Sequence, residues 1–337
     1  MKPWTLQRLL LTLLGSLLLW AILAGVCLML GSSGQFAWPD DPFVRGERIR
    51  IILLASLVGA ALASAGVVYQ ALLRNPLAEP YLLGVSSGAS LLSFVWTLPA
   101  VSTVIAIGGG IYVGQQLAAF IGAVGSMFLV FGLASRRGRI EPVSLLLVGV
   151  IVNSINGAIF LLLTYVVKDP ATPGGAISFL VGGLQGGADV RQVRIAAILV
   201  ALGWILLLLV SGKLNAAMLS DAEAESLGVN VQVLRWGGLL LASLMTAAAV
   251  AVSGPIGFIG LVCPHLARLL VGNDQRKLLP VATALGAGLL ALADRLTASL
   301  VAWHWLETVV PVGVLTALLG GPFFLIILMQ SQRRGAA

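Results

Sequence analysis

The chain has 337 residues, of which 59% are apolar and only 10% are charged. Soluble domains contain about 45–50% apolar and about 25% charged residues, so the composition excludes a soluble enzyme, a secreted disulfide scaffold and a disordered protein. The formal net charge is +7, but the charges are too few and too dispersed to build a phosphate-binding face, so no nucleic-acid partner is expected. Both cysteines lie in or beside apolar runs, which gives no sign of a disulfide framework.

Consecutive apolar stretches predict an all-α integral membrane protein with about ten transmembrane helices in contact with lipid. The runs are continuous rather than alternating, which disfavours a membrane β-barrel. The first run is longer than the core of a signal peptide and favours a retained helix. The predicted spans, of which the third and eighth are weak or short, are 9–30, 51–73, 81–98, 104–134, 143–166, 194–210, 236–253, 256–270, 279–294 and 309–330.

The distribution of basic residues predicts the orientation of the chain. With the N-terminus in the cytoplasm, most of the 20 Lys and Arg residues fall in inner segments, as the positive-inside rule requires. No polar connection is long enough for a soluble domain, so residues 1–337 are expected to form a single membrane domain, with an inner loop at about 211–235. Because no Walker A pattern is present, the chain is not expected to be an enzyme that hydrolyses ATP.

One ordered motif begins at Arg74 and continues to Ala89. Its Asn75-Pro76 and Glu79-Pro80 pairs break helices on both sides of a short loop. The small residues from Gly84 to Ala89 then open a helix with a face that allows close helix contact in lipid. A cytoplasmic turn followed by a plain packing face is the structural alternative.

A second motif extends from Gly254 to Arg268. It is expected to break a membrane helix at Gly254-Pro255 and again at Cys263-Pro264, and neighbouring protein or a cavity must then satisfy the freed backbone groups. His265 has no second histidine nearby in the sequence. It is therefore interpreted as a hydrogen-bonded structural residue, and no metal site is predicted.

Together the two motifs resemble the signatures of the FecCD/BtuC family, whose members are permease subunits of type II ABC importers for ferric siderophores, haem and cobalamin. The segment from Pro311 to Pro322 is similar to the last helix of that family. The resemblance covers residues 45–330, and the motif residues that carry it include Arg74, Asn75, Pro76, Gly84, Gly257, Gly260, Pro264, His265 and Arg268.

The resemblance implies a BtuC-like permease fold in the bacterial inner membrane, with both termini in the cytoplasm. It also implies a homodimer of permeases that works with two copies of an ABC ATPase subunit and with a substrate-binding protein. ATP and Mg would be bound by the ATPase, and this chain is expected to hold no cofactor.

The inner loop is expected to contain a short helix from Asp221 to Leu227. Ser220 or Asp221 is suited to cap its start and Gly228 its end. A solvated connector is the alternative reading, whereas the resemblance implies a helix that docks on the ATPase. The predicted coupling residues are Asp221, Glu223, Ala224, Glu225, Leu227 and Gly228.

The resemblance also implies a route between two permease copies, lined by the fifth and tenth helices. Polar groups inside a membrane helix usually face protein or water, although hydrogen bonds within one subunit are the alternative. The candidates for the route are Gly149, Asn153, Asn156, Gly313 and Thr316. Arg48, Arg50 and Arg295 are candidates for docking the binding protein, with snorkelling at the membrane interface as the alternative.

The predicted function is import of a ferric siderophore, with haem or cobalamin import by the same mechanism as the alternative and oxyanions as a further option. An ion-coupled secondary transporter usually needs an ionisable residue near the middle of the membrane, whereas Asp294 and Arg295 fall at the end of a predicted span. A structural or assembly protein would not need two broken motifs together with a capped inner loop.

Overall fold

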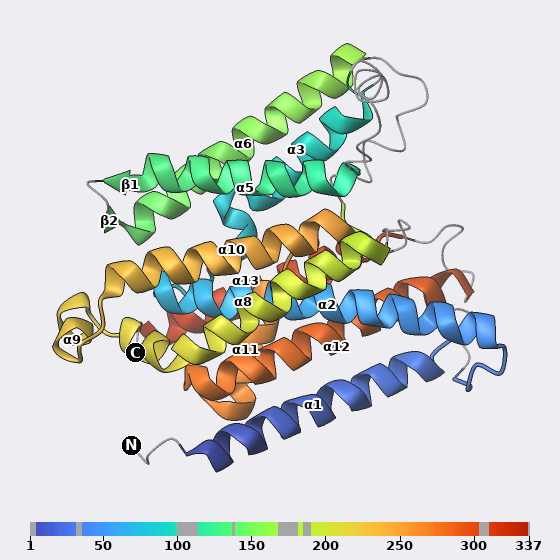
Figure 1. Ribbon diagram of the computed structural model, residues 1–337, viewed down its shortest axis with the longest axis horizontal. Coiled ribbons are helices and arrows are strands. Elements are labelled where there is room, and N and C mark those ends of the chain that lie inside the picture. The colour runs from blue at the N-terminus through green and yellow to red at the C-terminus, as the bar shows by residue number, and fades with distance from the viewer. Residues whose placement is uncertain are drawn as a thin grey trace.

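The computed structural model is built almost entirely of helices that follow its long axis (Figure 1). It describes residues 5–31, 36–98, 101, 114–136, 139–167, 181–184, 190–302 and 310–335. The elements are α1 (Leu6–Met29), α2 (Pro42–Leu72), the 3-10 helix η1 (Pro80–Leu83), α3 (Val85–Thr97), α5 (Gln115–Ala134), β1 (Ser135–Arg136), β2 (Arg139–Ile140), α6 (Pro142–Val167), α8 (Val190–Ala217), α9 (Asp221–Ser226), α10 (Val231–Ser253), α11 (Ile259–Val271), α12 (Gln275–Ala302) and α13 (Val312–Gly335).

Seven of the described helices are long and apolar enough to cross a membrane: α1, α2, α5, α6, α8, α10 and α12. The other predicted spans correspond to α13 and to two helices of 13 residues, α3 and α11, so the expectation that the third and eighth spans are short is confirmed. The start of α1, the end of α13, the β1–β2 hairpin and α9 all lie at the same end of the molecule (Figure 1). An even number of crossings gives this arrangement.

Helix α2 occupies the centre of the bundle, between α10, α11 and α12. Small residues allow these close approaches, as expected for helix packing in lipid. A Cβ atom added to Gly59 would collide with the Gly286 carbonyl of α12, and one added to Gly66 would collide with Gly260 of α11. Helix α2 is therefore a fixed frame against which the two motif regions are positioned.

Helices α3, α5 and α6 form a layer along one side of the bundle (Figure 1). Gly88 of α3 lies directly against Gly122 of α5, which confirms the small-residue packing face predicted for the first motif. Phe94 and Phe160 join α3 to α6, with ring centroids 4.9 Å apart. Close packing of α3 against α5 and α6 thus holds the three helices of this layer together.

The second motif breaks the chain at one of its two predicted points. Helix α10 ends at Ser253, and both Gly254 and Phe258 have left-handed backbones, with φ of 67° and 68°. The break predicted at Cys263-Pro264 is wrong, because α11 continues through Pro264. The carbonyl that Pro264 leaves without an N–H partner is that of Gly260, and the side chain of Gln70 donates to it instead.

A second difference concerns the ninth span, which was expected to end at residue 294. Helix α12 continues to Ala302, so Asp294 and Arg295 lie inside it rather than at its end. Both side chains are buried and form an ion pair of 2.7 Å. Because the two opposite charges pair with each other, the apolar helix can continue past them without leaving an isolated buried charge.

Candidate functional site

The short helix α9, at the end of the bundle that holds both termini (Figure 1), is closed at both ends by its own sequence. Ser220 and Glu223 form a capping box: the Ser220 hydroxyl accepts from the Glu223 N–H, and the Glu223 carboxylate accepts from the Ser220 N–H at 2.9 Å. At the other end Gly228 has a φ of 76°, and the N–H of Val229 donates to the Ala224 carbonyl over 3.0 Å, as in a Schellman motif. The predicted capping by Ser220 and Gly228 is confirmed.

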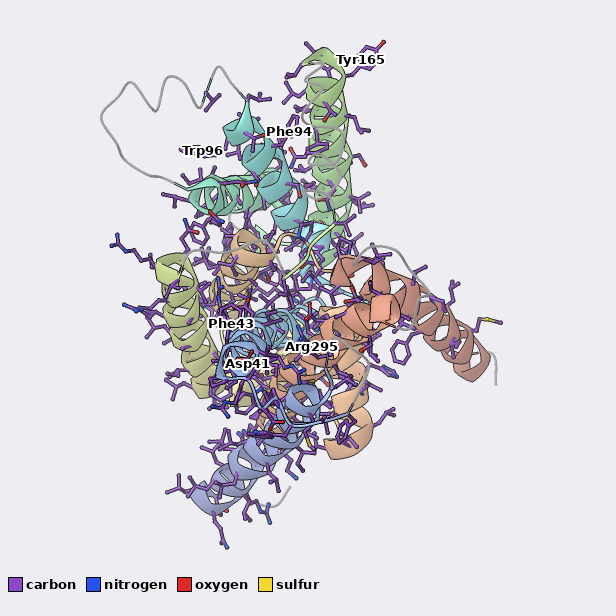
Figure 2. All side chains as sticks on the ribbon, turned by 90° about the vertical axis from the view of Figure 1, so that its right-hand side faces the viewer. Asp41, Phe43, Phe94, Trp96, Tyr165 and Arg295 are labelled. Carbon is purple, nitrogen blue, oxygen red and sulfur yellow. The ribbon has the colours of Figure 1, made fainter. Side chains whose placement is uncertain are left out.

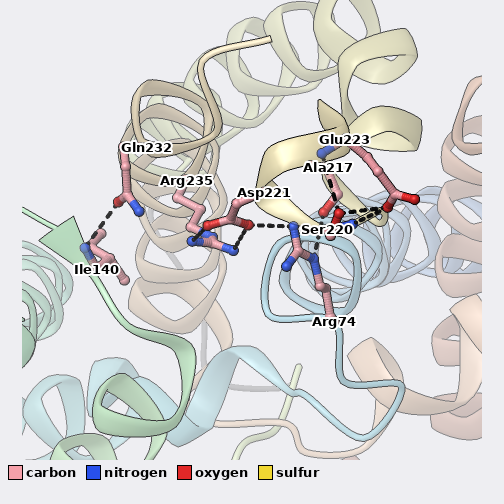
Figure 3. Close-up of polar contacts among 8 residues, drawn as sticks. All are labelled: Arg74, Ile140, Ala217, Ser220, Asp221, Glu223, Gln232 and Arg235. Atoms are coloured by element: carbon pink, nitrogen blue, oxygen red, sulfur yellow. Dashed lines mark hydrogen bonds and ion pairs between the residues drawn. The ribbon is translucent and has the colours of Figure 1, made fainter. Parts of the chain in front are cut away.

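The first residue of α9, Asp221, is joined to Arg235 of α10 and to Arg74, which follows α2 (Figure 3). Arg235 of α10 donates to both carboxylate oxygens over 2.9 and 3.1 Å, and Arg74 donates to one of them over 2.6 Å. Partial burial disfavours the charge of Asp221, but hydrogen bonds from and attraction to Arg235 and Arg74 hold its pKa below the usual range. Hydrogen bonds from Ser220 likewise lower the pKa of Glu223.

The predicted coupling residues therefore divide into two groups. Asp221 and Glu223 make hydrogen bonds within the chain although Asp221 is partly and Glu223 fully exposed, and Ala224 is fully buried. Glu225 and Leu227 are exposed, and the side chain of Leu227 is 64% accessible beside other exposed apolar residues of this end, Leu219 and Val233. Exposed apolar side chains next to a rigid charged helix favour a protein contact.

A chamber of about 250 Å³ lies between α3, α6 and the break after α10. It is lined by Tyr81, Ser86, Ser87, Ser90, Asn153, Asn156, Gly157, Phe160 and Pro255. Serine, tyrosine and asparagine side chains are among its lining residues and no charged side chain is, but apolar atoms form most of the lining surface. The chamber therefore offers a mainly apolar surface with a few hydrogen-bonding groups and no charge that would hold an ion.

Asn153 and Asn156 line this chamber, and they also make the hydrogen bonds within one subunit that were the alternative to a place on the route. Asn153 donates to the backbone oxygen of Tyr81 over 2.9 Å. Asn156 donates to Ser87 and Ser126 over 3.0 and 2.9 Å. The two readings are therefore compatible, because the asparagines hold the chamber wall together while facing it.

The other three candidates for the route make packing contacts instead. Gly149 is buried against the Leu82 carbonyl, where a Cβ atom would collide. Gly313 donates its N–H to Gly182, and Thr316 is 6% exposed with its hydroxyl bonded to the Gly313 carbonyl. None of these three residues lines the chamber, and their place on a route between two copies stays a prediction.

The two sequence motifs meet beside the chamber. The carboxylate of Glu79 accepts from the Phe258 N–H, and the Tyr81 hydroxyl accepts from the Ile256 N–H over 2.9 Å. These bonds satisfy backbone groups that the break after α10 frees from helical partners. Nearer the end that holds the termini, Arg268 donates to Gln70 over 2.6 Å, and the ring of His265 packs edge-on against Phe323.

The other motif residues make the turns between the helices. The side chain of Asn75 accepts from the Leu77 N–H over 2.9 Å, which forms a tight turn around Pro76 in the loop after α2. Gly84 has a φ of 78° at the junction of η1 and α3. Gly257 lies within the break, where an added Cβ atom would meet nothing within 4 Å. The motif thus encodes backbone geometry more than exposed chemistry.

Comparison with known proteins places this geometry in one family. The sequence profile of the FecCD transport family matches residues 8–330. The chain belongs to the FecCD transport family. It is 42% identical over 290 residues to the hemin transport system permease HmuU of Yersinia pestis, covering 85% of this chain and 83% of that protein. It is 39% identical over 289 residues to the Fe(3+) dicitrate permease FecD of Escherichia coli K12, covering 85% and 84%.

A solved structure supports the same assignment for the fold. A metal-chelate type ABC transporter in an inward-facing conformation superposes with a TM-score of 0.77 at 30% identity, covering 95% of this chain and 99% of that chain. The BtuC-like permease fold predicted from the FecCD resemblance is therefore confirmed.

The three arginines predicted to dock a binding protein have different surroundings in this FecCD-family chain. Arg48 donates to the carbonyl of Leu28 at the end of α1 over 2.9 Å, and Arg50 forms an exposed ion pair of 3.6 Å with Glu47. Both remain candidates for docking a binding protein. Arg295 does not, because it is 5% exposed and lies inside the bundle (Figure 2), paired with Asp294. Asp294 itself lines a cavity of about 460 Å³ between α3, α5, α10 and α13.

Four residues of this FecCD-family site were not identified from the sequence: Gln70, Glu79, Tyr81 and Arg235. Each acts through a partner that is distant in the chain, such as Asp221 for Arg235. One signal was available for Arg235, since a charged residue among apolar ones near the start of a membrane helix needs a partner. Gln70 and Tyr81 carried no comparable signal.

Proposed function

We propose that this chain is the membrane-spanning permease subunit of an ATP-driven ABC importer that moves an iron chelate from an outer binding protein into the cytoplasm. The observation that carries the proposal is the meeting of the two family motifs at the uncharged chamber beside α6, whose lining includes Asn153 and Asn156. Such a broken helix next to a water-accessible space is what a transport route in a membrane requires. Membership of the FecCD family supports the same reading.

In this proposal a separate ATPase binds ATP with Mg and does the chemistry, while this chain responds to it. Helix α9 docks on the ATPase through Glu225 and Leu227, which are exposed at the inner end. A second copy of the chain faces the open side of the chamber, and the two copies alternate access between states that the ATPase biases. Both termini lie in the cytoplasm, and the protein is placed in the bacterial inner membrane.

A ferric siderophore is the proposed cargo. The chamber lining of serines and asparagines carries no net charge, which suits a large chelate that must be released rather than held tightly. Haem is the second candidate, because the hemin permease of Yersinia pestis shares 42% of its residues over most of both chains. Cobalamin import by the same mechanism is the third.

Uptake in a strain that lacks this gene tests the proposal. Radiolabelled iron is supplied as ferric siderophores and as haem, with labelled cobalamin in parallel. Loss of siderophore-iron uptake, restored by the gene, is the expected result, and loss of haem uptake alone would move the assignment to haem. If a gene carrying Asn153→Leu restored uptake fully, the chamber would not be part of the transport route proposed here. Normal uptake of every labelled compound would overturn the iron-chelate assignment.

A further inference from the structure

The Asp221 carboxylate, whose side chain is 43% exposed, connects α9 to two neighbouring parts of the same subunit. It is shared by Arg235 of α10 and Arg74, which follows α2 (Figure 3). The Arg235 side chain is 4% exposed, and among the described residues its Nε has no hydrogen-bond partner. Asp221 therefore compensates for the burial of the Arg235 charge, because an unpaired buried charge is strongly unfavourable.

Arg74 is held in a conformation that its side-chain contacts explain. Its backbone has a φ of 48°, which a residue with a Cβ atom seldom adopts. Its Nε donates to the Ala217 carbonyl at the end of α8 over 2.9 Å, while a terminal nitrogen donates to Asp221. The guanidinium of Arg74 thus contacts both the end of α8 and the start of α9. Arg74 is also the first residue of the segment that runs to Tyr81, called here the Arg74–Tyr81 segment.

The Arg74–Tyr81 segment leads directly from this ion pair to the chamber. Pro76 and Pro80 fix two of its backbone dihedral angles and limit how far it can bend. At its far end Glu79 holds Phe258, and Tyr81 holds both Ile256 and Asn153. A displacement of Arg74 must therefore move the wall of the chamber or break these hydrogen bonds.

We propose that Asp221 is a positioning residue that transmits movement of α9 through Arg74 and the Arg74–Tyr81 segment to the chamber. The inference rests on the proposed function, because it takes a docked ATPase as the source of the movement. Rigid connection alone would not couple two sites; the coupling arises if nucleotide binding by the ATPase favours one position of α9 over another. The exposed residues of α9 make the docking contact, and Asp221 passes the displacement inward.

The test uses a single reporter thiol in the chamber of the complete transporter, reconstituted with its ATPase and binding protein. Ser86→Cys introduces the thiol, and the native Cys27 and Cys263 are buried. The modification rate with a water-soluble thiol reagent is measured with and without ATP. We expect ATP to change this rate by about tenfold in the parent reporter, as for a typical coupling free energy. Asp221→Asn should abolish the change while the ATPase still co-purifies.

Two further variants complete the design. Glu141→Gln removes an exposed carboxylate whose side chain contacts Ser144, and it should leave the ATP response intact. Arg74→Lys keeps the charge but cannot reach Ala217 and Asp221 with a planar fork; it should weaken the response, and it carries the test if Asp221→Asn does not accumulate.

Each other outcome has a defined meaning. An ATP response in Asp221→Asn equal to that of the parent overturns the proposal. Loss of ATPase binding in Asp221→Asn also overturns it, since Asp221 would then only shape the docking surface. A parent complex that binds ATPase but shows no ATP response overturns it as well. Failure of the parent chain to bind any ABC ATPase would instead overturn the proposed function.

Discussion

Gln70 of α2 donates a hydrogen bond of 3.3 Å to the carbonyl oxygen of Gly260 in α11. This is the oxygen that Pro264, four residues later, cannot bond because proline has no N–H. The buried Gln70 side chain thus supplies the hydrogen-bond donor that Pro264 lacks, which explains why α11 continues through the proline. The oxygen atom of the same amide also accepts a hydrogen bond from Arg268 over 2.6 Å.

Gln70→Leu is expected to destabilise the protein, because it leaves the Gly260 carbonyl and the Arg268 guanidinium without these partners. The expected loss is about 1–3 kcal/mol in the free energy of unfolding. It would be measured as a lower thermal denaturation midpoint in detergent. Gln7→Leu, on an exposed position of α1, is the control, and an equal midpoint in both variants would contradict the compensating role.

Gly59→Ala should also destabilise the bundle, because the added methyl group meets the backbone of Gly286 in α12. The added Cβ atom would lie 2.0 Å from the Gly286 oxygen, so the helices must separate by about 1 Å or more, at a cost of about 3 kcal/mol. Gly132→Ala is the matched control, since it lies in α5 with nothing within 4 Å of an added Cβ atom, and it should be neutral or slightly stabilising. Equal thermal midpoints for the two variants would show that the α2–α12 approach is loose.

Asn153→Leu should lower the initial uptake rate by about tenfold, or about 1.4 kcal/mol, because it removes a polar group from the chamber and its bond to Tyr81. The amount of protein in the membrane is measured in parallel. Ser154→Ala is the control, since the neighbouring Ser154 is exposed and bonds its own helix at Val150. Uptake at the parent rate would return Asn153 to a purely structural role.

Leu227→Asp is expected to weaken binding of the ATPase by about tenfold, as loss of one buried apolar anchor at an interface does. Leu227 is the exposed apolar residue at the end of α9, and Glu225→Lys should act in the same direction. Binding is measured by co-purification at several salt concentrations. Val143→Asp, at an exposed position at the start of α6, is the control for the general effect of a new charge at this end.

The ion pairs of Asp221 predict a pH dependence of stability. Because the pKa of Asp221 is lowered in the folded protein, its stabilising contribution is fully present above the ordinary carboxyl pKa of about 4. It is lost as the pH falls through the lowered folded value. The difference in thermal midpoint between the parent and Asp221→Asn should therefore be constant near neutral pH and shrink in acid. A difference that grows in acid would show the opposite sign of shift.

Much of the fold could be predicted from local sequence. A run of apolar residues indicates a membrane helix wherever the run is long enough to cross the lipid bilayer. The helix ends at Leu72, Ser253 and Ser226 were also predictable, because Asn-Pro, Gly-Pro and Gly act on the backbone beside them. The capping of α9 by Ser220 is a property of four consecutive residues. These features depend on interactions within a few residues, which the sequence displays directly.

The tertiary structure alone decided which side chains meet across the bundle. Pro264 lies within a helix because Gln70 is beside it, and Arg295 is withdrawn from the surface because α12 continues past it into the bundle. Asp221 is held against the bundle because Arg74 and Arg235, 147 and 14 residues away in the chain, converge on it. Such contacts depend on how the helices pack and turn against one another, and no pattern within a single helix encodes that arrangement.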